Sequence, residues 1–460
     1  MRENWRPASF LPDNHGVFTM DPDDFHGKQA ALDLMALDAY IYGYPLVLLD
    51  VTQRIMLTGG LQPNQFLHER SFPTPQYTTI VRPNVDTLYS MAWLDLGREP
   101  VVLQVPDTHN RYYLMELLDA WTNVFASIGA RTTGTKAGVY AITGPEWNGV
   151  LPEGIFRVAS PTNTVWVIGR TQTNGPQDYP SVHAIQNRYR LMPLRCWGSP
   201  QPPPRDCSGE NQHKVNPADL VANMDATAFF QTMAAAMVRN PPWIEDPAMN
   251  RKLAALGIAP AATFHFDSLS PAARRAFQAA VAIGPGRIKA ETVRNYAQNN
   301  IHGWITGRKG MGFYGADYGQ RAMIAMAGIG ANLPQDAVYA LSLLDAAGEQ
   351  LAGYHHYVLH FSGRQLPPVN AFWSLTLYND QGYLAANPLN RYAISPHLHR
   401  LHYNRDGSLD LFIGNDPPRE GAPDNWLPAP RGSFNLVLRM YWPDQQIITG
   451  RWNPPPLLRA

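Results

Sequence analysis

Charged side chains are scarce in this chain. Only 16% of its 460 residues are charged, and 37 basic side chains balance 37 acidic ones. An average soluble domain carries about 25% charged residues. A neutral chain has no electrostatic footprint for a phosphate backbone or an anionic lipid surface, so we expect neither nucleic acid nor membrane as a partner.

Cysteines and long apolar runs are also scarce. Cys196 and Cys207 could form at most one disulfide, so the fold does not depend on a disulfide framework. We find no run of about 18 apolar residues that would indicate a membrane span. The first residues lack the basic and apolar regions of a secretory signal. We therefore expect a soluble protein, cytoplasmic, or periplasmic if a leader has been removed.

Proline, glycine and aromatic residues are abundant instead. The chain has 41 Pro and 36 Gly, and 11% of its residues are aromatic. This composition favours many short strands joined by turns over a helical bundle. We expect an α+β, β-dominated fold with two jelly-roll or β-sandwich-like modules and a helical segment between them. The expected parts are an N-terminal arm (1–29), a helical entry with the first module (30–212), a helical connecting segment (213–336) and the second module (337–460).

Two details of this organisation are specific. In the helical entry, Gly43-Tyr44-Pro45 predicts a break between two helical pieces. Residues 173–212 are rich in Pro and Gln, and we expect them to be irregular.

The two β regions resemble each other in the order of their segments. RYYLMELLDAW (111–121) aligns with AFWSLTLYNDQ (371–381), and GVYAITGPEWNGVLP (138–152) aligns with DLFIGNDPPREGAPDNWLP (410–428). SPTNTVWVIGRT (160–171) then aligns with APRGSFNLVLRMY (429–441), both with an Arg near the end. Three blocks in the same order indicate an internal duplication.

Two glycine-rich segments resemble nucleotide-binding motifs in their residue pattern, but their context or residue order does not fit those motifs. Gly310-Met-Gly312-Phe-Tyr-Gly315 has the spacing of a dinucleotide fingerprint, but a polar segment precedes it in place of a buried strand. A tight turn before a helix is the better interpretation. Gly129 to Lys136 is a near-miss to a P-loop with Thr and Lys in the wrong order. The chain also has no Gly-x-Ser-x-Gly elbow and no His-Glu-x-x-His motif.

Histidines form two clusters in the second β region. His397 and His399 would point to one face of a strand, as metal ligands do, but no Glu follows shortly after them. His356 and His360 would lie too far apart on a strand to share a metal. Solvated or hydrogen-bonded histidines are the simpler interpretation, so His397 and His399 remain low-ranking candidates for a divalent metal.

The most informative polar residues lie within the aromatic strands of the first β region. RPNVDTLYS contains Asp86 and Tyr89, and NTVWVIGRT ends in Arg170. Charge is costly to bury unless it is paired, and Arg is the natural bidentate partner of a carboxylate. We interpret Asp86 as a general base, Tyr89 as an acid or orienting group, and Arg170 as a third catalytic residue. A structural ion-pair network is the alternative, and the sequence leaves both open.

We place the pocket between the two modules, because domain junctions commonly hold pockets. The predicted substrate-binding residues are Asn84, Arg111, Tyr112, Asp119, Trp121, Asn123, Tyr314, Arg321, Trp373 and Tyr378. We expect hydrolase- or lyase-type acid–base chemistry on a small apolar or aromatic molecule, without a cofactor. The alternatives are a metal-dependent oxidoreductase that uses the second-module histidines and a non-catalytic binder of carbohydrate or lipid. Abundant Trp and Tyr on an uncharged surface favour a homodimer.

The same segments carry a family resemblance. RPNVDTLYSMAWLDL, RYYLMELLDAWTN and PTNTVWVIGRT resemble the bacterial domain of unknown function 1254. GFYGADYGQRA, FWSLTLYN, NRYAI, DGSLDLFI and NWLPAP resemble its usual partner, domain of unknown function 1214. The resemblance implies two β-rich modules with a helical segment between them, and almost nothing about the reaction. The family pattern carries onto Asn84, Asp86, Tyr89, Arg111, Asp119, Arg170, Tyr314, Arg321, Trp373, Tyr378, Arg391 and Trp426.

Overall fold

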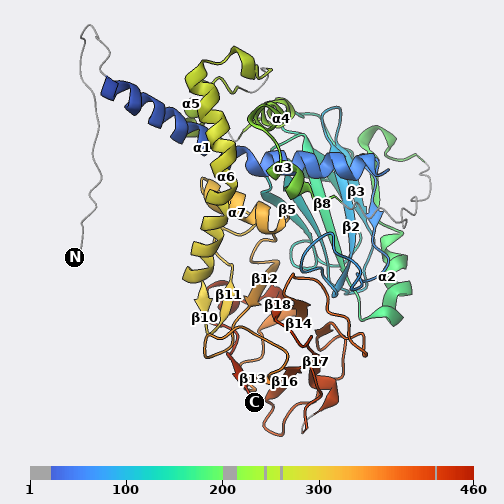
Figure 1. Cartoon of the computed structure of the whole chain (residues 1–460). Helices are drawn as coiled ribbons and strands as arrows, with labels where there is room; N and C mark the ends of the chain where they lie inside the picture. The colour runs from blue at the N-terminus through green and yellow to red at the C-terminus, as the bar shows by residue number, and fades with distance from the viewer. Residues whose placement is uncertain (1–21, 200–214, 243–245, 260–262, 420–421) are drawn as a thin grey trace.

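The fold is α+β, as the sequence predicts: two sheet-rich regions are separated by a helical segment (Figure 1). The computed structural model describes residues 22–199, 215–242, 246–259, 263–419 and 422–460. Most of the predicted N-terminal arm, and Cys207, lie outside the described residues. The helices are α1 (Pro22–Thr58), α2 (Tyr179–Gln186), α3 (Pro217–Ala222), α4 (Ala226–Arg239), α5 (Pro247–Ala255), α6 (Pro271–Gln298), α7 (Tyr318–Gly328) and α8 (Gln445–Ile448).

The first module is a sandwich of two sheets. One sheet has the order β1-β2-β8-β4-β5 and the other has the order β7-β6-β3-β9. A hydrophobic core that includes Leu103, Met115, Ile142 and Val167 fills the space between them. The strands are β1 (Leu67–His68), β2 (Thr87–Asp95), β3 (Val101–Val105), β4 (Tyr113–Asp119), β5 (Val124–Gly129), β6 (Gly138–Thr143), β7 (Phe156–Ala159), β8 (Thr164–Gln172) and β9 (Arg190–Pro193).

The second module repeats this arrangement. Its sheets have the orders β10-β11-β12-β18-β14-β15 and β17-β16-β13-β19. The two short strands β10 and β11 come from the segment that we predicted to be helical, and they extend the larger sheet. The strands are β10 (Asn300–Ile301), β11 (Trp304–Thr306), β12 (Ala337–Ser342), β13 (Tyr357–Phe361), β14 (Val369–Asn379), β15 (Ala393–Ile394), β16 (Leu409–Gly414), β17 (Trp426–Pro428), β18 (Phe434–Pro443) and β19 (Leu457–Arg459).

The strand orders confirm the predicted internal duplication. The series β2-β8-β4-β5 corresponds to β12-β18-β14-β15, and β7-β6-β3-β9 corresponds to β17-β16-β13-β19. The same parallel pair recurs in both modules, β6 with β7 and β16 with β17. Strand register fixes the residue equivalence, since Tyr89 faces Arg170 as Tyr339 faces Arg439.

The predicted break in the helical entry is wrong, because α1 continues through Pro45 to Thr58. Residues 42–49 are all buried. A Cβ on Gly43 would lie 2.3 Å from Met233 Sδ of α4, so the glycine allows α4 to approach closely. Packing on every side therefore outweighs the unfavourable helix propensity of Gly and Pro.

Helix α1 is also long and apolar enough to cross a membrane by length and composition alone. Its mean hydropathy over the most apolar window reaches 1.4, but 67% of that window is buried against the rest of the chain. Figure 1 shows α1 crossing the upper part of the molecule beside α6 and the first module.

Two further segments differ in how they match the sequence predictions. The segment expected to be irregular contains α2 and β9. The glycine-rich segment 310–315 is a loop before α7 with Gly310, Gly312 and Gly315 at positive φ, as the tight-turn interpretation predicts.

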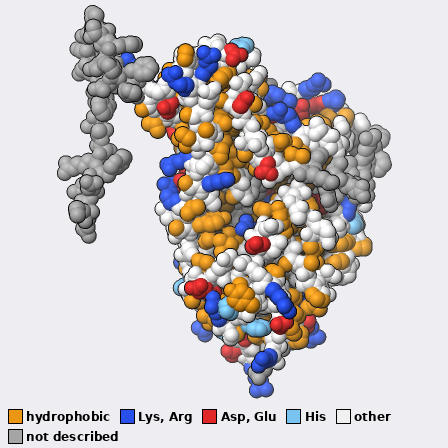
Figure 2. Space-filling view, viewed as in Figure 1, with side chains coloured by type: hydrophobic (Ala, Val, Ile, Leu, Met, Phe, Trp, Pro, Cys, Tyr) orange, Lys and Arg blue, Asp and Glu red, His pale blue; other side chains and the backbone are white. Residues whose placement is uncertain are grey.

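Over the face shown in Figure 2, basic and acidic side chains are interspersed and do not form a patch of one sign.

Candidate functional site

One face of the first module's larger sheet is covered by two different parts of the chain. Trp166 and Leu118 pack in the cluster that contains α1 and α7. Tyr112 and Leu114 pack against Phe372 of the second module. Side chains of a strand alternate between faces, so Glu116 lies on this same face between Leu114 and Leu118. Glu116 therefore sits where the first module, the second module and the helical segment meet.

A buried ion pair occupies this junction. Arg170 Nη1 donates a hydrogen bond of 2.9 Å to Glu116 Oε2, and the two residues are 4% and 0% exposed. The Arg170 guanidinium lies over the ring of half-buried Tyr89, 5.3 Å from its centroid. Burial raises the pKa of Glu116 to about 7, although the Arg170 charge opposes the rise.

Four buried polar atoms at the junction make no hydrogen bond of good geometry with a described residue. They are Glu116 Oε1, Arg170 Nε, Tyr112 Oη and Asn332 Nδ2. Their side chains are close enough to interact, since the Asn332 amide lowers the pKa of Glu116 and the charges of Arg170 and Glu116 act on Tyr112. We call Tyr89, Tyr112, Glu116, Arg170 and Asn332 the junction site.

The second module contains an equivalent arginine, Arg439, which forms no ion pair with a described carboxylate, although the charge of Asp86 raises its pKa. Arg439 Nη1 donates to Thr376 Oγ1 at 3.0 Å, where the first module has Glu116. The Arg439 guanidinium lies 5.4 Å from the ring centroid of Tyr339, as Arg170 lies over Tyr89. The duplicated halves have therefore diverged at one position, and only the first carries a titratable carboxyl there.

Asp86 belongs to a different group of contacts, which joins the two modules. Its Oδ2 accepts hydrogen bonds from Ser374 Oγ at 2.6 Å and Tyr441 Oη at 3.2 Å. Asn84 supports it by accepting from the Asp86 amide and donating to Tyr441. Tyr378 adds a third link by donating to the Pro83 carbonyl at 2.7 Å.

The equivalent of Asp86 in the second module makes the reciprocal contacts. Asp336 accepts from Ser127 Oγ at 2.6 Å and pairs with Arg131 at 2.7 Å, both in the first module. The backbone repeats the relation: Thr173 donates to the Asp86 carbonyl, and Trp442 donates to the Asp336 carbonyl. Asp86 and Asp336 therefore act as a pair of inter-module clamps.

A third group of predicted residues surrounds the turn between β4 and β5. Asp119 accepts from the backbone amides of Trp121 and Asn123 at 2.8 Å, which fixes the turn. Asn123 Oδ1 in turn accepts from the Tyr314 amide at 3.3 Å, so the loop before α7 is tied to this turn.

Arg321 of α7 lies next to this turn in an aromatic cage. Its guanidinium lies 5.0 to 5.3 Å from the rings of Tyr42, Trp121 and Tyr318. It also donates to the Tyr42 carbonyl of α1 at 3.0 Å. Arg321 thus joins α1, α7 and the first module, which is a packing role.

The remaining predicted residues lie apart from these groups. Arg111 pairs with Asp178 and lines a separate surface pocket. Trp373 is in the core of the second module. His397 contacts Ser395, and burial lowers the pKa of His399 to about 4. Within the described ranges, no group of three or more His, Cys, Asp or Glu could hold a metal ion.

Family models match both modules. A protein family of unknown function, DUF1254, matches residues 63–193, and a second one, DUF1214, matches residues 336–445. The chain belongs to the family that combines these two domains. In these terms, Glu116 and Arg170 lie in the DUF1254 domain, Thr376 and Arg439 lie in the DUF1214 domain, and Asn332 lies just before the second domain.

The fold is similar to that of a solved structure, the VPA0106 protein from Vibrio parahaemolyticus. That protein is 22% identical, with a TM-score of 0.69 over 93% of this chain and 100% of that one. An uncharacterised protein from Burkholderia cenocepacia is 12% identical, with a TM-score of 0.44 over 95% of each chain. No curated protein matches this chain.

Sequence reasoning missed Glu116, Asn332 and Asp336. Glu116 is the one charge within the otherwise apolar strand YLMELL of the DUF1254 domain, and that isolation is a usable signal. Asp336 precedes Tyr339 by three residues as Asp86 precedes Tyr89, but the internal alignment began further along the chain. Nothing in the sequence around Asn332 indicates that it reaches Glu116.

Proposed function

We propose that this protein is an enzyme that performs acid–base chemistry on a small apolar or aromatic molecule at the junction site. The observation that carries the proposal is the group of buried polar atoms around the Glu116–Arg170 pair, of which Arg170 Nε and Tyr112 Oη have no hydrogen-bond partner among the described residues. More than nine in ten buried polar groups in proteins are hydrogen-bonded, so an unsatisfied cluster requires a further partner. A substrate that offers oxygen atoms to this cluster would satisfy it.

The roles follow from the chemistry of each group. Glu116 accepts a proton through Oε1, because a carboxyl with a pKa near 7 is present in both forms at neutral pH. Arg170 Nε and Tyr112 Oη donate hydrogen bonds to the substrate oxygen that gains negative charge. Burial raises the pKa of Tyr112 above its ordinary value, so the phenol stays protonated and remains a donor.

The proposed step is removal of a proton from a carbon next to a carbonyl or carboxylate. The C–H bond breaks, its electron pair moves toward the oxygen, and the proton bonds to Glu116 Oε1. Glu116 then returns the proton to the substrate or passes it to a leaving group. Leu114, Ile168 and the tyrosine rings supply apolar walls for the substrate body.

This proposal moves the base from Asp86 to Glu116. Asp86 uses Oδ2 to hold Ser374 and Tyr441 of the other module, and its Oδ1 has no hydrogen-bond partner among the described residues, but Asp86 has no described arginine paired with it as Glu116 has. Tyr89 and Arg170 keep functional roles. Tyr89 is half-buried and its ring covers the Arg170 guanidinium.

Exchange of hydrogen with heavy water tests the proton transfer directly. Full-length protein is incubated in D2O with a panel of small aromatic and branched ketones and carboxylic acids, and deuterium uptake is followed by mass spectrometry. We expect uptake with the wild type and a loss of about 10²- to 10⁴-fold in Glu116→Gln, without loss of binding. Thr376→Val, at the equivalent position of the second module, is the matched control and should retain the wild-type rate.

Three outcomes would contradict the proposal. These are no exchange anywhere in the panel, exchange that persists in Glu116→Gln, and binding at the junction site without exchange. The last outcome would favour the alternative of a non-catalytic binding protein.

A further inference from the structure

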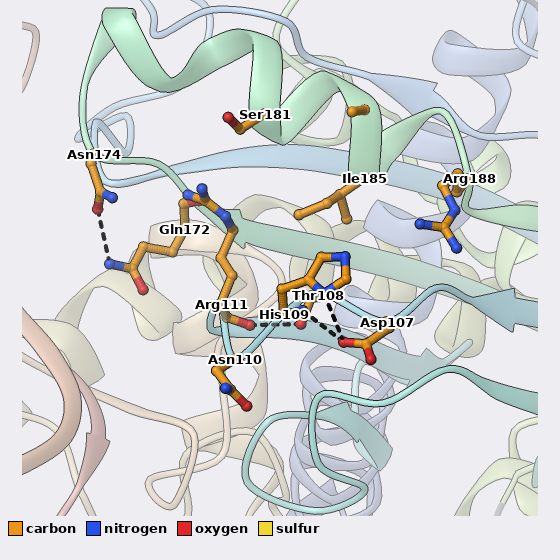
Figure 3. Close-up of a pocket in the computed structure, with 11 residues that line it drawn as sticks. Asp107, Thr108, His109, Asn110, Arg111, Gln172, Asn174, Ser181, Ile185 and Arg188 are labelled. Atoms are coloured by element: carbon orange, nitrogen blue, oxygen red, sulfur yellow. Dashed lines mark hydrogen bonds and ion pairs between the residues drawn. The ribbon is translucent and has the colours of Figure 1, made fainter.

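A surface cavity lies away from the junction site, at the edge of the first module. It measures about 450 Å³ and lies between the turn that joins β3 to β4, the end of β8, and helix α2 (Figure 3). None of its lining residues belongs to the junction site. Its lining includes Arg111, which we predicted to bind substrate between the modules.

The charges that line this pocket do not cancel. Asp107 is paired with Lys136 at 2.9 Å and lies 3.7 Å from His109 Nδ1, and Asp178 is paired with both terminal nitrogens of Arg111. Arg188 also lines the pocket, but its side chain makes no hydrogen bond or ion pair with any residue that the structure describes. The acidic groups are thus neutralised locally, and Arg188 is left without a partner among the residues that the structure describes.

The turn beside Arg188 is strained in a way that keeps a histidine at the pocket. His109 and Asn110 have φ angles of 54° and 63°, and the Arg111 amide donates to the Thr108 carbonyl, so they are the central residues of a type I′ turn. Such turns favour Asn-Gly, because glycine adopts positive φ without strain. Asn, Asp and His are the side-chain-bearing residues most often found at positive φ, so this turn holds the His109 side chain at the rim of the pocket.

The geometry points to a binding site for a small organic carboxylate in this pocket. In the view of Figure 3, the His109 ring lies between the Arg111 and Arg188 side chains, below Ile185 of α2. Arg188 attracts the carboxylate and His109 donates a hydrogen bond to it. Ala184 and Ile185 form the apolar wall against which the hydrocarbon part of the ligand packs.

Fluorine NMR titration of the full chain with para-fluorobenzoate tests this inference. Neutral para-fluorobenzamide is the matched ligand without charge. We expect benzoate to bind more tightly than benzamide and Arg188→Gln to weaken benzoate about tenfold, while Arg188→Lys retains most of the affinity. Arg190→Gln removes the same charge two residues away, at a side chain that donates to backbone carbonyls outside the pocket, and should leave the affinity unchanged.

His109→Gly separates a ligand-binding role from a structural one. Glycine relieves the strain at positive φ, so the variant should have a higher Tm than the wild type and yet bind benzoate more weakly. Glu116→Gln should bind benzoate at this pocket as the wild type does, which keeps the test independent of the proposed enzymatic function. Equal affinity for benzamide, no effect of Arg188→Gln, or a lower Tm with unchanged affinity in His109→Gly would each overturn the inference.

Discussion

Arg170 and Arg439 occupy equivalent positions in the two modules, but only Arg170 faces a carboxylate. Both guanidiniums lie over a tyrosine ring, and each donates to the neighbouring strand of its own sheet, β4 in the first module and β14 in the second. Arg439 also donates to the Arg82 carbonyl at 2.8 Å, so it keeps a second acceptor. Arg170 depends more heavily on its one strong partner, Glu116.

Because of this difference, replacing Glu116 by alanine should lower the free energy of unfolding more than replacing Thr376 by alanine. Glu116→Ala leaves the Arg170 charge buried and unpaired, which should lower the free energy of unfolding by about 3–5 kcal/mol. Thr376→Ala removes one hydrogen bond from the charged Arg439, which keeps a second acceptor, and should cost about 1.5–3 kcal/mol. Urea denaturation of the two variants measures both values, and equal costs would show that the pair is not the main partner of Arg170.

At the scale of elements, helix α1 shows how tertiary packing decides local structure. The sequence Gly43-Tyr44-Pro45 has the composition of a helix break, yet α1 runs through it without interruption. Gly43 faces Met233 of α4 at a distance that excludes any side chain, whereas a Cβ on Gly27 of the same helix would meet no other atom within 4 Å. Gly43 is therefore needed for the close contact between α1 and α4, whereas Gly27 makes no such contact.

Gly43 and Gly27 give a matched pair of substitutions within one helix. Gly43→Val forces bulk into the contact with α4 and should destabilise the protein by about 1–3 kcal/mol. Gly27→Ala adds helix propensity in open space and should stabilise it by about 0.5–1 kcal/mol. Chemical denaturation measures the change in the free energy of unfolding of each variant. Destabilisation by both variants would mean that backbone flexibility, rather than close packing, explains Gly43.

At the scale of the whole molecule, the two modules hold each other through reciprocal acidic clamps. Asp86 reaches from the first module to Ser374 and Tyr441, and Asp336 reaches from the second module to Ser127 and Arg131. A shared polar interface of this kind couples the unfolding of the parts it joins, because breaking it exposes buried polar groups on both sides.

We therefore expect the full chain to unfold in one calorimetric transition. Asp336→Ala leaves Arg131 without its ion-pair partner and should lower the free energy of unfolding by roughly 3–5 kcal/mol. Asp86→Ala leaves two hydroxyls without an acceptor and should cost about 1–3 kcal/mol. Asp410→Asn, which weakens an exposed pair with His360, is the control and should cost less than about 1 kcal/mol. Two separate transitions in the wild type would contradict the claim that this polar interface couples the unfolding of the two modules.

Much of this architecture could be predicted from the sequence because it depends on local patterns. Apolar alternation and turn residues indicated the strands, and the repeated order of three blocks indicated the duplication that the strand orders confirm. The aligned ends of two blocks even placed Arg170 and Arg439 at equivalent positions.

The site could be predicted only in part because it depends on contacts between distant segments. Tyr89, Tyr112 and Arg170 were correctly expected near the module junction, but Glu116 was hidden in an apolar strand and Asn332 comes from the loop after α7. Asp119 and Arg321, which we predicted to bind substrate, hold a turn and a helix contact in the structure. Burial and charge alone do not distinguish these two uses of a polar residue.

The protonation of Glu116 tests the central claim most directly. Its pKa is raised from 4.5 to about 7, so its contribution to stability is greatest below pH 4.5 and is lost as the pH rises through 7. Infrared difference titration of the full chain should show a buried carboxyl that ionises near pH 7 and disappears in Glu116→Gln. Glu69, whose pKa burial also raises to about 7, is the control, and Glu69→Gln should leave the Glu116 band in place. A Glu116 carboxyl that stays ionised below pH 4.5 would show a purely structural ion pair and contradict the proposed acid–base centre.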